Sequence, residues 1–223
     1  RCKIIITSGT SISYLGISNK TIKYTLWHGT GIKQTEYIND FDKNMELLSN
    51  INSFDYINFT SNYTSNFIAK VVMKLPSKKI VVNGYPRFDQ ILNLQNHKDL
   101  KILKNKYIND LNLSQNINND TKILIYTPTW RNKDKNNFFP MLNMNEFNIK
   151  SFNDFLNKNN HFLFYTSHPN SVGYDLEHSN IKYLDYKKLP IFDLTNFFLI
   201  CDILINDYST TALEFALLKK KQI

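Results

Sequence analysis

Two short polar stretches of this chain carry residues that could do chemistry. His28 lies in residues 27–30, and Ser209 and Thr210 lie in residues 207–211. An imidazole titrates near neutral pH, so His28 could take a proton from an attacking hydroxyl, and a structural histidine is the equally weighted alternative. Hydroxyls and backbone N–H groups could hold a phosphate, and simple helix capping is the alternative there. Together the two stretches indicate chemistry on a phosphate-bearing substrate.

Three further polar motifs follow predicted strands. Residues 84–89 contain an arginine that could make a bidentate phosphate contact or a surface pair with Asp89. Residues 127–131 offer two hydroxyls and a guanidinium. Residues 167–169 offer a histidine that could donate a hydrogen bond to a phosphate oxygen, and a structural role is the alternative. The candidates from these motifs are Arg87, Thr127, Thr129, Arg131 and His168. Five strand-end motifs in one chain are stronger evidence for a site than any one of them.

Apolar runs alternate with segments of helical spacing along the chain. Strands are predicted at residues 3–7, 22–27, 55–60, 79–83, 122–127, 162–166, 181–183 and 202–206, with a further strand beginning at the end of the sequence. Helices are predicted at residues 43–50, 63–73 with Ser61 as the cap, 98–110, within 144–158, from 190 onward, and at 211–219. Alternating strands and helices imply parallel sheets, whose carboxyl ends would carry the motifs.

Composition leaves several classes of partner open. The 223 residues carry a net charge of +8 and are 42% hydrophobic, which suits one large or two small globular domains. The positive charge fits nucleic acid, an anionic membrane surface or a polyanionic substrate. No nucleic-acid motif, disulfide framework, zinc spacing or membrane-spanning apolar run is present in the sequence. Cys201 lies in an apolar run and is expected to be a buried, reduced thiol.

Residues 26–33, 84–89, 126–131, 168–169 and 202–210 resemble the motifs of the CDP-glycerol glycerophosphotransferases, the teichoic-acid and capsule polymerases and primases. The five motifs stand in family order between about residues 22 and 218. The resemblance implies an α/β, GT-B-like fold: two Rossmann-like domains with parallel sheets that face each other across a cleft. Residues 1–92 would form the acceptor-side domain and residues 93–223 the CDP-donor domain, each incomplete beside the usual family pattern. The polar region 93–120 is the expected junction.

The resemblance also implies roles for the site residues. His28 would be the general base and His168 a catalytic contact to the donor phosphate. The substrate-binding residues would be Gly29, Thr30, Lys33, Arg87, Thr127, Thr129, Arg131, Asp207, Ser209 and Thr210. No tightly bound cofactor or metal site is expected, although a divalent cation could assist.

The implied reaction transfers a polyol phosphate, with glycerol phosphate as the first choice, from a CDP-activated donor and releases CMP. The acceptor would be a hydroxyl of a growing polyol-phosphate polymer or of a lipid-linked glycan. The expected location is cytoplasmic and peripheral, on the anionic inner face of the cell membrane, and nucleic acid is not an expected partner. Two alternatives stay open: a GT-B glycosyltransferase that uses a nucleotide sugar, and a non-catalytic module that binds a nucleotide or polyanion.

Overall fold

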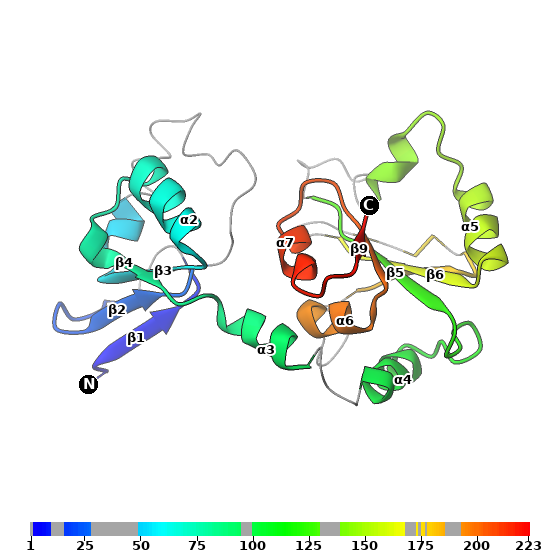
Figure 1. Cartoon of the computed structure of the whole chain (residues 1–223), viewed down its shortest axis with the longest axis horizontal. Coiled ribbons are helices and arrows are strands. Elements are labelled where there is room, and N and C mark those ends of the chain that lie inside the picture. The colour runs from blue at the N-terminus through cyan, green and yellow to red at the C-terminus, as the bar shows by residue number, and fades with distance from the viewer. Residues whose placement is uncertain are drawn as a thin grey trace. The chain divides into compact units, whose positions relative to one another are not determined.

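The computed structural model describes residues 2–9, 16–27, 49–94, 100–129, 139–167, 173, 175–176, 178–185 and 193–223. The chain divides into two compact units, Arg1–Phe88 and Asp89–Ile223. Each unit contains one parallel sheet with helices packed on it (Figure 1). The alternation of strands and helices predicted from the sequence therefore holds in both units.

The first unit has a four-stranded parallel sheet in the order β1–β2–β3–β4. The strands are β1 (Ile4–Thr7), β2 (Ile22–Thr25), β3 (Tyr56–Phe59) and β4 (Ile80–Val82). The apolar core of this unit joins β3 to the helical segment that follows it, with the buried residues Ile51, Phe54, Ile57, Phe59, Ala69, Met73 and Leu75. Burial of these side chains removes apolar surface from water and so stabilises the unit.

The segment after β3 begins as predicted but has a wider turn than expected. Ser61 caps α2 (Asn62–Thr64) through a capping box with Thr64. The helix continues as the π-helix η3 (Ser65–Val72), and the Met73 N–H donates to the carbonyl of Ile68 at 2.8 Å. A five-residue spacing returns to the same face of a π-helix but not of an α-helix. The wider turn therefore brings Ile68 and Met73 onto the same core.

The second unit has a five-stranded parallel sheet in the order β7–β6–β5–β8–β9. The strands are β5 (Lys122–Tyr126), β6 (His161–Tyr165), β7 (Ile181–Tyr183), β8 (Ile203–Ile205) and β9 (Lys221–Gln222). The last of these confirms the strand expected at the end of the sequence. β5 and β6 are apolar along their whole buried length, which is typical of a parallel strand that is covered on both faces.

Helices cover both faces of the second sheet. The helical elements are η4 (Ser77–Lys79) in the first unit, then α3 (Pro86–Leu94), α4 (Leu100–Asp110), η5 (Pro140–Asn143), α5 (Ile149–Lys158), α6 (Leu194–Ile200) and α7 (Thr211–Ala216). Ile123 and Ile125 of β5 share one core with residues of α4, α6 and α7. Leu124 and Tyr126 share the opposite core with α5 (Figure 1). The alternation of side chains along β5 thus builds three layers.

Some expected boundaries differ from the structure. Residues 93–120, the expected junction, include α4, and Ile108 of that helix is buried in the second unit's core. The predicted helix 43–50 lies mostly outside the described residues. Its last two residues, 49 and 50, are described and are helical.

In the part of the chain that the structure describes, no helix combines the length and the apolar character needed to cross a membrane.

Candidate functional site

The second sheet reverses its strand order between β5 and β8. From β5 the chain builds outward through β6 to β7, and then returns to place β8 and β9 on the other side of β5. Open α/β sheets bind ligands in the crevice outside the carboxyl ends of the strands at such a switch point. Thr127 and Thr129 follow β5, and Asp207 follows β8. The topology therefore brings two of the five predicted motifs together at the position where a ligand is expected.

Asp207 is bound to Thr129 across this switch point. The backbone N–H of Thr129 donates to both carboxylate oxygens of Asp207 at 3.0 Å, and Thr129 Oγ1 donates to Oδ1 at 2.5 Å. The N–H of Tyr208 also donates to Oδ1, at 2.6 Å. The predicted substrate contact Asp207 thus has both oxygens engaged by the protein itself.

A second hydroxyl contact joins the same two segments. Thr127 Oγ1 and Thr211 Oγ1 lie 2.8 Å apart, and the backbone N–H of Thr127 donates to the carbonyl of Ile205 at 3.2 Å. Thr127 is almost fully buried, whereas Thr211 is half-buried. The sequence analysis did not single out Thr211, although it directly follows the two hydroxyls of Ser209 and Thr210 and begins the helix.

Ser209 and Thr210 lie in the turn between β8 and α7. Thr210 occupies the N-cap position of α7 with helical φ and ψ, and its side chain makes no capping hydrogen bond. The N–H groups of Ala212 and Leu213 donate back to the carbonyls of Ser209 and Thr210 at 3.2 and 3.1 Å. Since α7 has only six residues, an anion here would depend on hydroxyl groups more than on a helix dipole.

In the first unit, the described chain leads up to His28 through a strained residue. Thr25 Oγ1 donates to the carbonyl of Gly9 at 2.9 Å and accepts the N–H of Trp27 at 3.1 Å. Trp27 has a φ of 60°, which is rare for a bulky side chain. Strained backbone of this kind occurs most often at functional sites. His28 itself lies outside the described residues, as do Gly29, Thr30 and Lys33.

A buried asparagine holds the turn that leads to Arg87. Asn58 of β3 is 1% exposed, donates through Nδ2 to the carbonyl of Gly84 at 2.5 Å, and accepts the hydroxyl of Tyr24 at 3.2 Å. Gly84 has a φ of 76°, a conformation that glycine adopts at little cost. Asn58 is a positioning residue that the sequence analysis missed, and its signal was a polar residue within an apolar strand.

The guanidinium of Arg87 lies over two aromatic rings. Its Cζ atom is 4.8 Å from the ring centre of Tyr85 and 5.5 Å from that of Phe88. Tyr85 is buried and packs edge-to-face on Phe88 with ring centres 5.3 Å apart. Stacking of this kind orients a planar guanidinium while its N–H groups can still reach a phosphate at the edge. Arg87 is therefore held in the first turn of α3, which follows β4.

The remaining predicted residues lie outside the described chain. Arg131 and His168 belong to this group. The residue before His168 is described: Ser167 Oγ lies 2.7 Å from the hydroxyl of Tyr183 and is buried at the carboxyl end of β6. Among the described residues, no group of three or more His, Cys, Asp or Glu side chains could hold a metal ion.

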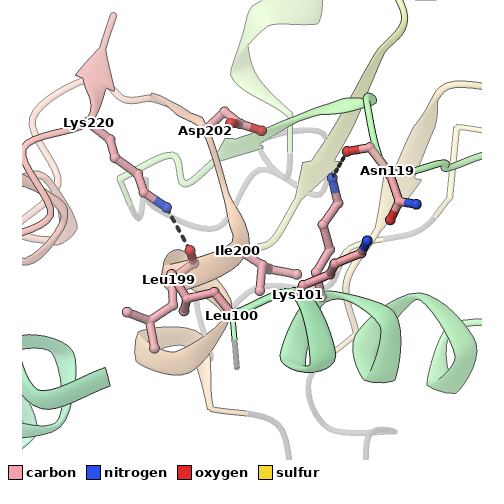
Figure 2. A pocket seen from close by; sticks show the side chains of 8 residues that line it. Leu100, Lys101, Asn119, Leu199, Ile200, Asp202 and Lys220 are labelled. Carbon is pink, nitrogen blue, oxygen red and sulfur yellow. Dashed lines mark hydrogen bonds between the residues drawn. The ribbon is translucent and has the colours of Figure 1, made fainter. Parts of the chain in front are cut away.

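A pocket of about 370 Å³ lies at the opposite, amino-terminal edge of the second sheet (Figure 2). Lys220 donates there to the carbonyls of Leu199 and Cys201 at 2.6 and 2.7 Å, and Lys104 donates to the carbonyl of Thr121 at 2.9 Å. Burial lowers the pKa of both lysines. The two ammonium groups cap main-chain carbonyls, so we regard this pocket as structural.

Comparisons with known proteins agree with these motifs. The model of the CDP-Glycerol:Poly(glycerophosphate) glycerophosphotransferase family matches residues 1–223. A teichoic acid glycerol-phosphate transferase of Staphylococcus aureus is 26% identical over 237 residues, which cover 100% of this chain and 57% of that protein. A teichoic acid poly(glycerol phosphate) polymerase of Bacillus spizizenii is 26% identical over 215 residues, covering 87% of this chain and 48% of that protein. The chain thus spans about half the length of the curated relatives it matches.

The fold is also similar to that of a solved enzyme. A variant of the wall teichoic acid polymerase TagF superimposes with a TM-score of 0.75 at 20% identity, covering 99% of this chain and 53% of that chain. A TagF variant soaked with CDPG gives a TM-score of 0.73 at 21% identity, with coverages of 99% and 52%. At this level of identity the similarity concerns the fold, and it confirms the α/β, GT-B-like class predicted from the sequence.

Proposed function

The chain belongs to the CDP-glycerol:poly(glycerophosphate) glycerophosphotransferase family, and from this premise we propose that it transfers glycerol phosphate from CDP-glycerol and releases CMP. The acceptor is a hydroxyl of a polyol-phosphate polymer or of a lipid-linked glycan. The family match along the whole of residues 1–223 is the observation that carries this proposal. The hydroxyl groups at the switch point of the second sheet support it, because they lie where an open α/β sheet binds a ligand.

In the proposed reaction, the acceptor hydroxyl attacks the phosphorus that bears the glycerol. His28 takes the proton of that hydroxyl, and the bond between this phosphorus and the bridging oxygen of the diphosphate breaks, so that CMP leaves. His168, Ser209 and Thr210 contact the diphosphate and stabilise the negative charge that develops on it. In this scheme residues 1–92 form the acceptor side and residues 93–223 hold the donor.

Arg87 and Arg131 provide positive charge in the proposed scheme. The stacked guanidinium of Arg87 is already ordered by Tyr85 and Phe88, so little rotamer freedom would be lost when it binds a phosphate. Gly29, Thr30 and Lys33 follow the proposed base closely in the sequence and would bind the acceptor. The proposed scheme includes no tightly bound metal, and a divalent cation could assist by neutralising charge on the diphosphate.

We also propose that the protein binds peripherally to an anionic membrane surface, on the cytoplasmic side. The support is a patch on the outer face of α2 and η3, formed by Tyr63, Phe67 and Val71, which are 78%, 55% and 61% exposed. The rings of Tyr63 and Phe67 stack with centres 6.4 Å apart. Exposed aromatic and aliphatic side chains of this kind are typical of helices that lie in a membrane interface.

The charge around this patch also fits an anionic surface. Lys70 and Lys74 are exposed next to the patch, and residues 56–88 contain no Asp or Glu. Basic residues near an anionic leaflet each contribute about 1 kcal/mol to binding. Flotation with phosphatidylglycerol vesicles tests this, with Phe67→Ser expected to release the protein. Phe155→Ser, at a stacked and 53% exposed ring of α5, is the matched control; equal release by both variants would contradict the assignment.

The reaction is tested by measuring transfer of labelled glycerol phosphate from CDP-glycerol by the full chain. His28→Ala is expected to lower the rate by about 10²–10⁴-fold with CDP binding retained, because a general base contributes on that order. His178→Ala, at a histidine outside all five motifs, should keep the wild-type rate. A near-normal rate for His28→Ala would contradict the base assignment. Transfer from UDP-glucose in place of CDP-glycerol would favour the glycosyltransferase alternative.

A further inference from the structure

Each hydrogen bond at the switch point has a donor and an acceptor. These assignments indicate which hydroxyls of the site can still donate to a ligand. We infer that Asp207 is a positioning residue whose carboxylate fixes Thr129 as an inward donor, so that the Thr127–Thr211 hydroxyl pair is what donates to an anionic oxygen of the ligand. The inference rests on the proposed function for the identity of the ligand, a nucleoside diphosphate. It changes the expected roles of Asp207 and Thr129 and adds Thr211 to the site.

The first step concerns Thr129. A threonine hydroxyl has one hydrogen, and in Thr129 that hydrogen is donated to Asp207 Oδ1. The remaining lone pairs of Thr129 Oγ1 can only accept, and the main-chain N–H of Thr129 is also directed at the Asp207 carboxylate. Thr129 therefore has no donor to offer to a phosphate oxygen. An anion next to this hydroxyl would meet lone pairs, which is repulsive.

The second step concerns Asp207. An ionised carboxylate beside a diphosphate would weaken binding by like-charge repulsion, unless donors compensate its charge. Three protein groups supply that compensation: the N–H and the hydroxyl of Thr129 and the N–H of Tyr208. The same bonds join the segment after β5 to the segment after β8. Asp207 thus acts on the ligand through the position of its neighbours.

The third step concerns the Thr127–Thr211 pair. Two hydroxyls that share one hydrogen bond contain two hydrogens, so one hydrogen is left to donate elsewhere. Thr127 is 3% exposed, whereas Thr211 is half-buried. We therefore assign Thr127 as the donor to Thr211, which leaves the hydroxyl hydrogen of Thr211 to donate to a ligand. Thr211 lies two residues after Ser209 and one after Thr210, the hydroxyls expected near the diphosphate. The three side chains form one hydroxyl-bearing turn at the end of β8.

The chain offers a matched control for Asp207 at the other end of the same two strands. Asp202 precedes β8, and its Oδ2 accepts the N–H of Ile123, the second residue of β5, at 2.8 Å. It also lies 3.6 Å from the ammonium of Lys122. Asp202 and Asp207 flank β8 and both accept main-chain N–H groups of the neighbouring segment, Asp202 from β5 and Asp207 from the loop after β5, but only Asp207 lies at the carboxyl edge. Asp202→Asn should disturb folding without disturbing ligand binding.

The test measures the dissociation constants of CDP and inorganic pyrophosphate by calorimetry with the full chain, below the unfolding temperature of every variant. Thr211→Val should weaken both ligands by on the order of tenfold, the usual effect of one hydrogen bond to a charged group. Thr129→Val should weaken both ligands less than Thr211→Val does, because the N–H of Thr129 still holds the Asp207 carboxylate. Asp207→Asn should weaken both ligands, and adding Thr211→Val to it should cost less than in wild type, since neighbours in one network are not additive.

Each outcome decides the matter. A larger loss of affinity with Thr211→Val than with Thr129→Val, together with unchanged binding in Asp202→Asn, supports the inference. Wild-type affinity in Thr211→Val, or an equal loss with Thr129→Val, overturns it while leaving the proposed function intact. If wild type itself binds neither ligand and shows no transfer from CDP-glycerol, the proposed function fails and takes the inference with it.

Discussion

Thr129 and Asp207 are 78 residues apart in the sequence, and three hydrogen bonds join them in the structure. The donors are the N–H and hydroxyl of Thr129, a buried residue three positions beyond the end of β5. The acceptors are the two carboxylate oxygens of Asp207, two positions beyond the end of β8. This contact holds two loops of the site in one fixed arrangement, and its removal should be measurable in stability as well as in ligand binding.

Replacing the carboxylate should destabilise the second unit. Asp207→Ala leaves the buried N–H of Thr129 without its acceptor, and we expect a loss of about 1–2 kcal/mol in the free energy of unfolding, at the low end for a charged hydrogen bond because Asp207 itself is exposed. Urea denaturation followed by circular dichroism measures this. Asp154→Ala, at an exposed position of α5, should change the stability by less than about 0.5 kcal/mol. Equal effects of the two substitutions would contradict the expectation.

The two described glycines with positive φ allow the effect of backbone strain on stability to be separated from an effect on the transfer reaction. Gly16 and Gly84 have φ of 54° and 76°, and an added Cβ would meet no atom within 4 Å at either position. Gly16→Ala and Gly84→Ala should therefore each cost about 1–2 kcal/mol from backbone strain alone. Only Gly84→Ala should also slow transfer from CDP-glycerol, because Gly84 begins the turn that carries Arg87. Similar transfer rates in the two variants would argue against a role for that turn.

The two cysteines of the sequence should differ in reactivity. Cys201 is fully buried, its thiol donates to the carbonyl of Phe197 at 3.2 Å, and burial raises its pKa well above the ordinary value. Cys2 is exposed. Since the thiolate is the reactive form, we expect Cys201 to react with a disulfide reagent more than about a hundredfold slower than Cys2 in the native protein. Equal rates after addition of guanidinium are the control, and equal rates before it would contradict the burial.

Lys220 should stabilise the fold in a pH-dependent way. Lys220→Met keeps the aliphatic stem but removes the donors to the carbonyls of Leu199 and Cys201, and should cost about 1–2 kcal/mol at neutral pH. Burial holds the pKa of Lys220 below its ordinary 10.5 in the native state. Between these two pKa values the unfolded chain binds more protons, so native stability rises with pH there.

Wild type should therefore gain stability relative to Lys220→Met as the pH rises towards 10.5. Denaturation curves over this pH range measure the difference between the two proteins. Lys221→Met, at the exposed neighbouring position in β9, is the control and should follow wild type. A difference between wild type and Lys220→Met that shrinks with rising pH would contradict the sign of the effect.

Local patterns in the sequence predicted the elements well where burial determines them. The apolar runs became β5, β6 and β8, and Ser61 caps the helix that follows β3 because its hydroxyl satisfies a free N–H there. The predicted helix 211–219 ends earlier, at Ala216, and Lys219 just beyond it has a φ of 54°. Helix ends depend on such local turns, which composition alone does not specify.

The roles within the site were less accessible from sequence. Thr129 and Asp207 both follow predicted strands, and each residue type binds ligands in other proteins, so the sequence indicated two ligand contacts. Their contact with each other depends on the strand order, which places β8 next to β5 after the chain has left for β6 and β7. The same holds for Asn58, whose partner Tyr24 lies in β2 and whose partner Gly84 follows β4, the strands on either side of β3.

β8 has only three residues, Ile203–Ile205, and a carboxylate contact lies beyond each of its ends: Asp202 binds Ile123 of β5, and Asp207 binds Thr129 in the loop after β5. Because both contacts have fixed positions, they set the number of residues that fit between Asp202 and Asp207. Changes among apolar residues within residues 203–206 would preserve that number, whereas inserting or deleting one residue would break one of the two contacts. In evolution this segment should therefore drift in composition while its length stays constant.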